Sequence, residues 1–397
     1  MIRCTKCLYP ETTKPFITFD EEGVCGGCRT SEEKDTIDWE ERGKLLRTLI
    51  KESIKKPQNP NYDCIIPVSG GKDSTYQVHY VKNVLGLKPL LVCFNHQDNS
   101  YTGIRNLENL VTKLGCDLVR YTPSPDTVKK CCRISVDKLA DPFWHEHAGI
   151  FTYPIQVAVK EKIPLIIWGE YGHLDLTGMN SLHDFVEMNK KNRVEHSMRG
   201  LDGDAFLEGN EEGLTKRDIP FAYYPSNDEI SELDLVGIYL GNFIKWNSIS
   251  QTKEMIFKYD FMTSEKERTF NIYENAECYY NDTVHDYMKY LKYGYNRAVD
   301  HASQLIRLGY INRDTGAFLA NRYNKTYPHD KFIEWCKWAA LDYKEVMRKC
   351  KMWHEVDPDI TNFDDIEYDG SKVDVNILSQ LYIKNATKTD QNRRYYL

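Results

Sequence analysis

The spacing of apolar residues through the middle of the chain predicts strands that alternate with helices. Apolar runs typical of buried strands occupy residues 62–68, 89–95, 117–121, 164–168 and 235–244. Helical spacing of apolar positions marks the segments between them, at 72–85, 103–114, 126–139 and 151–161. Alternating elements of this kind predict an α/β fold, a doubly wound parallel sheet with helices on both faces.

The turn after the first predicted strand carries the most informative motif of the chain. It reads Ser69, Gly70, Gly71, Lys72, Asp73 and Ser74. A strand that turns through glycines into a helix points free backbone N–H groups and the positive end of the helix dipole at one spot. The lysine adds a full charge and the serines add hydroxyl donors. The sequence therefore predicts a phosphate-binding turn, although the spacing is not that of a Walker A loop.

Polar residues also follow the second and fourth predicted strands. Because ligands of parallel sheets bind beyond the carboxyl ends of the strands, Asn95 and His96 are predicted to contact the adenine or ribose of a nucleotide. Glu170 follows the fourth strand, and with Asp73 it is predicted to hold Mg²⁺. The alternative for Glu170 is a structural role in capping a loop.

Two CxxC pairs near the N-terminus predict a metal site. Cys4 and Cys7 are separated from Cys25 and Cys28 by 17 residues, a spacing typical of a zinc ribbon with four thiolate ligands. A redox role is the competing interpretation, but it predicts one pair in a thioredoxin-like setting. The sequence around Cys25 also matches Gly-x-Cys-x-Gly, the nucleophile turn of class I glutaminases. No His-x-Glu occurs in the chain to complete that chemistry, so structural Zn²⁺ is the prediction.

Composition narrows the classes of partner and compartment. A net charge of −7 argues against a large nucleic-acid footprint. No apolar run is long enough to span a membrane, and the N-terminus lacks the apolar core of a signal peptide. The twelve cysteines are therefore expected as thiols and metal ligands in a reducing cytoplasm.

The remaining residues predict further regions and candidate substrate contacts. At 397 residues we expect several units: a zinc-ribbon leader at 1–36, the α/β domain at 37–250, a helical domain at 251–355 and a tail at 356–397. An insertion at about 171–230 is expected at the rim of the sheet. His147, Arg297 and Arg307 are candidate substrate ligands, each with an ordinary structural role as the alternative. Cys131 and Cys132 are interpreted as structural, with a sulfur-handling role as the alternative.

The string SGGKDS resembles the pyrophosphate loop of adenine-nucleotide α-hydrolase families, the HUP-like ATP pyrophosphatases. Together with the CxxC pairs, LLVCFNH, DPFWHEHAGI, IPLIIWGE and KYGYNRAVDHASQLIRLGYINRDTG, it resembles the N-acetyl sugar amidotransferase family of the WbpG/PseA type. The resemblance runs from residue 1 to about 350 and implies a cytoplasmic enzyme of surface-glycan or flagellin-sugar biosynthesis.

That resemblance implies an AMP-forming ligase that acts on a nucleotide-linked N-acetyl sugar with ATP, Mg²⁺ and structural Zn²⁺. The acetamido oxygen would be adenylated and replaced by ammonia. Because no glutaminase signature is present, ammonia is expected from a separate subunit that resembles the glutaminase of histidine biosynthesis, with its barrel-fold companion as a further candidate partner. The alternatives are a tRNA thiolase, which would need a basic face and a catalytic cysteine, and a zinc-ribbon scaffold without activity.

Overall fold

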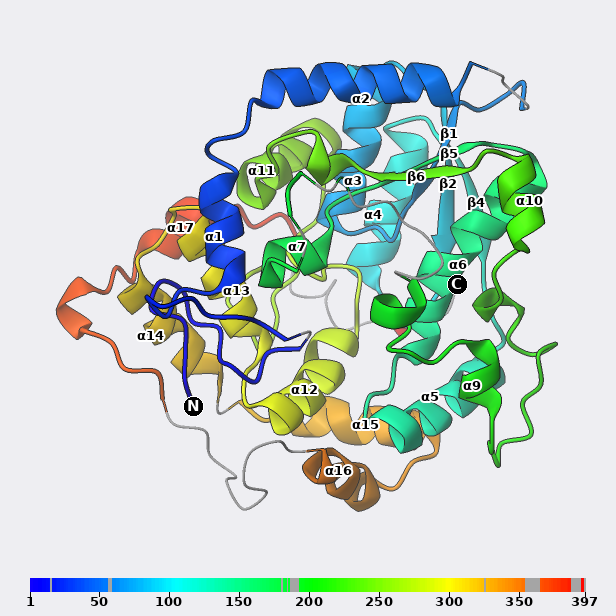
Figure 1. Cartoon of the computed structure of the whole chain (residues 1–397). Coiled ribbons are helices and arrows are strands. Elements are labelled where there is room, and N and C mark those ends of the chain that lie inside the picture. The colour runs from blue at the N-terminus through cyan, green and yellow to red at the C-terminus, as the bar shows by residue number, and fades with distance from the viewer. Residues whose placement is uncertain are drawn as a thin grey trace.

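A computed structural model describes residues 1–14, 16–55, 59–179, 181–183, 185, 193–324, 326–353, 365–386 and 394–395. Its centre is a five-stranded sheet of β1 (Cys64–Pro67), β2 (Pro89–Phe94), β4 (Asp117–Tyr121), β5 (Leu165–Trp168) and β6 (Val236–Tyr239) (Figure 1). The strands lie in the order β4-β2-β1-β5-β6, and all four pairs are parallel. The chain moves outward on one side of β1 and then continues on the other side. The carboxyl ends of β1 and β5 therefore flank the point where the strand order reverses.

Both faces of the sheet are covered by helices, as the continuous apolar strands predict. Cys64, Ile66 and Leu91 pack with side chains of α2 (Trp39–Ser53), α3 (Lys72–His79) and α4 (Tyr101–Thr112). The alternate strand residues, including Ile65 and Leu90, pack instead with α6 (Trp144–Glu161). The α/β prediction is confirmed at this level, and membership of the HUP-like class stays a prediction.

Two predicted elements have different bounds in the structure. The helix expected at 151–161 begins seven residues earlier, at Trp144. Trp144 is buried and stacks on Phe206 with ring centroids 3.6 Å apart, a long-range contact that local spacing does not reveal. The strand expected at 235–244 ends at Tyr239, and Leu240–Asn242 form a short 3-10 helix. Leu240 and Phe243 are buried, so the apolar run marks burial rather than strand geometry.

The helical region that follows the sheet packs with the N-terminal leader. Cys4, Cys7 and Leu8 share one apolar core with α13 (Arg297–Arg307) and α14 (Arg313–Asn324). In Figure 1 the blue leader and α1 (Gly26–Glu33) lie beside α13 and α14. The predicted boundaries between these regions are not tested by this packing.

The other elements form the rim of the sheet and the remainder of the helical region. The π-helical turns are Tyr80–Val84, Arg193–Ser197 and Asn281–His285, and the other 3-10 turns are Pro220–Ala222 and Gly370–Lys372. A short pair of strands joins β3 (Asn99–Ser100) to β7 (Arg394–Tyr395). The further helices are α5 (Pro125–Leu139), α7 (Gly172–Thr177), α9 (Gly203–Leu207), α10 (Asn227–Glu232), α11 (Ser248–Tyr259), α12 (Asp286–Tyr293), α15 (His329–Ala339), α16 (Tyr343–Met352) and α17 (Ile377–Leu381).

Within the described ranges, no helix combines the length and the apolar character needed to cross a bilayer. Parts of the predicted rim insertion and of the tail lie outside the described residues.

Candidate functional site

The predicted phosphate loop joins β1 to α3 at the carboxyl edge of the sheet. Gly70 has φ +88°, and a Cβ atom there would lie 2.4 Å from the carbonyl oxygen of Gly103, so glycine is required on both counts. The loop is braced internally. The N–H of Gly71 donates to Ser69 Oγ at 3.2 Å, and Ser74 Oγ donates to the Gly71 carbonyl at 3.1 Å. The shape of the turn is therefore fixed by its own residues, with the N-terminus of α3 directly behind it.

A carboxylate already lies against this loop. Ser69 Oγ donates to Glu277 Oε1 at 3.1 Å, and a Cβ atom on Gly71 would lie 2.5 Å from the same oxygen. Burial raises the pKa of Glu277, while the hydrogen bond from Ser69 acts in the opposite direction. The loop thus contacts an acidic group at the position where the sequence predicts an anion.

Lys72 is the buried cation of the loop. Its side chain is 4% exposed, and Nζ lies 2.6 Å from Asp73 Oδ2 and 3.0 Å from Glu274 Oε1. Burial alone would lower the pKa of Lys72, but the carboxylates of Asp73, Glu274 and Glu170 outweigh it and hold the pKa above its usual value. Lys72 is therefore charged at neutral pH.

Glu170 lies just beyond β5, in the same acidic environment. Burial raises its pKa well above the usual value, and the nearby charges of Asp175 and Asp73 raise it further. Lys34, which is ion-paired with Asp175, acts in the opposite direction. The structure thus brings Asp73 and Glu170 into one electrostatic group around Lys72. Carboxylates beside a phosphate loop are suitable Mg²⁺ ligands, and the assignment of Mg²⁺ to them stays a prediction.

The predicted nucleotide contacts Asn95 and His96 are buried beneath other segments. The side-chain amide of Asn95 donates to Thr122 Oγ1 at 3.0 Å, and its oxygen accepts from Asn99 Nδ2 at 2.6 Å. His96 Nδ1 accepts the N–H of Asp98 at 3.0 Å. Burial, with the nearby charges of His145 and Arg120, lowers the pKa of His96 to about 3. Their role in ATP binding stays a prediction.

His147 lies in the first turn of α6, near a buried ionic cluster around Asp141. Asp141 Oδ2 is 2.7 Å from Arg199 Nη1 and 2.9 Å from His285 Nδ1. Burial and the charge of Arg199 lower the pKa of His147 to about 3, so its imidazole is neutral. A substrate contact by His147 stays a prediction.

The two arginines predicted to bind substrate lie in different environments. Arg297 begins α13, and its charge acts on Glu274, the partner of Lys72. Arg307 ends the same helix and lies against the cysteines, where Nη2 is 3.2 Å from Cys25 Sγ. Its other nitrogen, Nη1, donates to the carbonyl of Asp175 at 2.7 Å. The structure therefore places Arg297, but not Arg307, in the electrostatic group of the phosphate loop.

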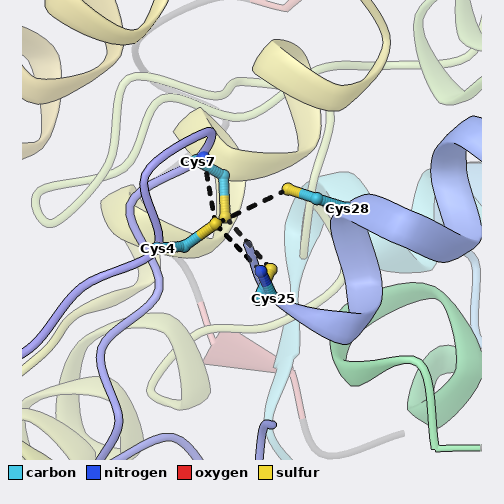
Figure 2. A group of neighbouring side chains, drawn as sticks. All are labelled: Cys4, Cys7, Cys25 and Cys28. Atoms are coloured by element: carbon cyan, nitrogen blue, oxygen red, sulfur yellow. Dashed lines mark hydrogen bonds between the residues drawn. The ribbon is translucent and has the colours of Figure 1, made fainter. Parts of the chain in front are cut away.

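The four N-terminal cysteines converge as their spacing predicts (Figure 2). Cys4 Sγ lies 3.9 Å from Cys28 Sγ, and Cys7 Sγ lies 3.6 Å from Cys25 Sγ. All four side chains are buried, and the N–H of Cys25 donates to Cys4 Sγ at 3.2 Å. Four sulfur donors with backbone N–H support and an adjacent arginine fit a structural metal ion such as Zn²⁺.

Cys131 and Cys132 are unsuited to catalysis. Both are fully buried, on different faces of α5, in two different apolar clusters. Burial raises the pKa of both thiols. Because a nucleophilic cysteine needs an accessible thiolate, the structural interpretation is favoured over a sulfur-handling role.

Sequence reasoning missed the acidic residues that reach the loop from a distant segment. Glu274 and Glu277 lie in an irregular stretch between α11 and α12, some two hundred residues from Ser69. No helical or strand spacing marks them. The available signal is the pair of carboxylates themselves, in the string YENAEC just before the π-helical turn Asn281–His285.

Two matches with known proteins each cover part of the chain. Residues 267–369 match the family model described as the C-terminal domain of WbpG-like LPS biosynthesis proteins. A protein of Methanocaldococcus jannaschii, described as uncharacterized protein MJ1599, is 27% identical over 118 residues. That alignment covers 30% of this chain and 42% of the relative, so it spans less than half of either protein.

Proposed function

Because the chain has the C-terminal domain of WbpG-like lipopolysaccharide biosynthesis proteins, we propose that it is an ATP-dependent amidotransferase. The enzyme adenylates the N-acetyl group of a nucleotide-linked acetamido or diacetamido sugar and replaces the acetamido oxygen with ammonia. The product is an acetamidino sugar for a bacterial surface glycan or flagellin glycan. AMP and pyrophosphate are released.

The phosphate loop is the observation that carries this proposal. Its glycine at positive φ, its internal hydrogen bonds and its contact with the Glu277 carboxylate together describe a cradle for an anion. The charged and buried Lys72 stands at the start of α3, where it can neutralise a departing pyrophosphate.

Adenylation answers a chemical need of this substrate. An acetamido carbonyl is a poor electrophile, and ammonia does not displace its oxygen unaided. The acetamido oxygen attacks the α-phosphorus of ATP, and the bond between that phosphorus and the bridging oxygen of pyrophosphate breaks. Ammonia then attacks the imidate carbon and AMP leaves with the acetamido oxygen. The amide nitrogen and ammonia together bring four hydrogens; the amidinium product keeps three of them at neutral pH, and the fourth is released as a proton.

The chain's residues divide the remaining tasks. Mg²⁺ held by Asp73 and Glu170 would supply charge neutralisation at the phosphates. Lys72 balances those carboxylates with Glu274 as its second partner. The cysteine cluster holds the leader and takes no part in the reaction, because a metal ion bound by all four sulfur atoms would have no open position for a substrate. We place the reaction in the cytoplasm, with ammonia from a separate glutaminase.

The test uses the pure chain with ATP and a panel of nucleotide-linked diacetamido sugars, with bulk tRNA as a parallel arm. We expect sugar-dependent release of AMP and pyrophosphate, and amidine formation with ammonium. An acetamido group labelled with heavy oxygen should deliver the label to AMP. Release of AMP with tRNA alone would contradict the sugar substrate, and amidine formation with glutamine as the only nitrogen source would contradict the separate glutaminase.

A further inference from the structure

Three buried side chains with metal-binding atoms converge at the end of β2, away from the cysteines. His96 and Asp98 follow β2, and Glu146 lies in the first turn of α6. One donor atom from each of the three lies within 4.8 Å of the others. Their exposed fractions are 5%, 1% and 4%. An imidazole and two carboxyl groups are thus concentrated in a site from which bulk water is largely excluded.

The two carboxyl groups are oriented by the segment at the start of the π-helical turn Asn281–His285. Asp98 Oδ1 accepts the N–H of Tyr280 at 2.7 Å, and Asp98 Oδ2 accepts the N–H of Asn281 at 2.8 Å. The side chain of Asn281 donates to Glu146 Oε2 at 3.1 Å. Each carboxylate oxygen can accept more than one bond, so this support leaves room for a metal ion. Hydrogen bonds of this kind fix the direction of ligating carboxylates.

One oxygen in the cluster has no hydrogen-bond partner. Glu146 Oε1 is buried without a hydrogen bond and lies 3.7 Å from His96 Nδ1. An unsatisfied buried carboxyl oxygen is costly, and native proteins rarely retain one without a reason. Burial raises the pKa of both carboxyl groups, and the nearby charge of Arg394, whose guanidinium donates to the Gln97 carbonyl at 2.9 Å, acts in the opposite direction. A divalent cation would give the orphaned oxygen a partner and favour the ionised form of both carboxyl groups.

We propose that His96, Asp98 and Glu146 form a second metal site, distinct from the cysteine cluster, for a zinc-type divalent cation. One nitrogen and two oxygens suit Zn²⁺, Mn²⁺ or Fe²⁺ rather than the all-oxygen sites of Ca²⁺. The ion takes Nδ1 of His96, which gives up the hydrogen bond from the Asp98 N–H, and Oε1 of Glu146. The ion connects the loop after β2 with α6. Its two carboxylate ligands are already held by hydrogen bonds from Tyr280 and Asn281.

Metal analysis of the full chain tests this site without any assay of activity. After saturation with zinc and removal of free metal, we expect about two ions per wild-type chain and about one in Glu146→Gln. His96→Asn should match Glu146→Gln, and Cys4→Ser should lose the other ion. The control Glu108→Gln replaces an exposed carboxylate on α4 and should keep both ions.

Cobalt distinguishes the two sites in one chain, because only thiolate ligands give intense sulfur-to-metal charge transfer. Cobalt added to chain whose cysteine site already holds zinc should give weak d–d bands without that charge transfer. Those bands should be absent in Glu146→Gln, whose fold is checked by circular dichroism. One zinc per wild-type chain, or a second ion retained by both Glu146→Gln and His96→Asn, would overturn the proposal.

Discussion

At the scale of single residues, the site depends on charges that are buried together. Lys72 is almost fully enclosed, and its ammonium group is the partner of Asp73 and Glu274. Removing one partner of a buried ionic group leaves the others uncompensated. Substitution of such a residue therefore changes both activity and folding stability, so each variant needs a measurement of folding beside the activity assay.

Lys72→Met is expected to reduce sugar-dependent AMP formation by about 100-fold or more, because the charge that faces the departing pyrophosphate is lost. Lys72→Arg keeps the charge and should retain more activity. Single-turnover AMP release measures both. The control is Lys82→Met, since Lys82 is bound to backbone carbonyls at Leu114 and Gly115 outside the loop. Full activity in a folded Lys72→Met chain would contradict the assigned role.

Asp141 predicts a pH dependence of stability. Burial alone would raise the pKa of Asp141, but Arg199, His285 and Lys292 outweigh it and hold the pKa well below its usual value. A lowered folded pKa stabilises the fold above the unfolded pKa of about 4, and that stability is lost as pH falls toward the folded pKa.

Asp141→Asn should therefore cost roughly 3–5 kcal/mol at neutral pH, with the gap to wild type narrowing below about pH 4. Urea unfolding across a pH series measures the gap. The exposed Asp137, paired with Lys349 on the surface, supplies the control Asp137→Asn, which should change stability by less than about 1 kcal/mol. A gap that stays constant into strong acid would show that Asp141 does not act through its charge.

At the scale of elements, α1 and α7 approach through backbone rather than side chains. A Cβ atom on Gly27 would lie 2.5 Å from the carbonyl oxygen of Leu176 and from Arg307 Nη2. A Cβ atom on Gly26 would lie 2.6 Å from the carbonyl oxygen of Thr177. These glycines set the distance between the cysteine cluster and the helix that follows Glu170.

Gly27→Ala is expected to destabilise the fold by about 1–3 kcal/mol, because the methyl group meets a backbone carbonyl that has little room to move. Gly43→Ala is the matched control, since nothing lies within 4 Å of a Cβ atom at Gly43 in α2. That substitution should stabilise by roughly 0.5–1 kcal/mol through helix propensity. Thermal and urea unfolding compare the two. Equal effects of the two substitutions would argue against a close approach of α1 and α7.

The strands of the sheet could be predicted from the sequence because each is marked by its own run of apolar residues. The apolar runs predict all five strands of the sheet, and the glycines of the phosphate loop mark the turn after β1. The start of α6 was missed because Pro142 and a dense polar string are typical of a turn. The helix is stabilised there by packing of Trp144 on Phe206, a contact between segments 62 residues apart by number.

At the scale of the whole molecule, the parts of the site that sequence did not predict are contacts between distant segments. Glu277 reaches Ser69 across 208 positions, and Arg307 reaches Cys25 across 282. Local spacing carries no information on such pairs. Arg307 is a candidate substrate ligand by its residue type, while in the fold its partners are sulfur atoms and the carbonyl of Asp175.

Removal of the metal ion predicted at the cysteine cluster is expected to affect the helical region as well as the leader. The cysteines share one apolar core with α13 and α14, so a chelator should increase amide exchange in both helices. Amides of α4, which pack in a separate core, serve as the internal reference. Cys28→Ser should reproduce the effect, and Cys336→Ser, a buried cysteine of α15 outside the cluster, should not. An increase in amide exchange confined to residues 1–36 would contradict the shared core.

The Glu277 carboxylate gives the phosphate loop an internal competitor. Ser69 Oγ already donates to Glu277, so a phosphate that takes this hydroxyl would displace the carboxylate, and its observed affinity would be the difference between two binding free energies. The displaced carboxylate belongs to the same short stretch as Tyr280 and Asn281, whose N–H groups hold Asp98. Displacement of Glu277 would thereby couple binding at the loop to the acidic cluster beyond β2, and by reciprocity a ligand at the cluster would change the affinity of the loop.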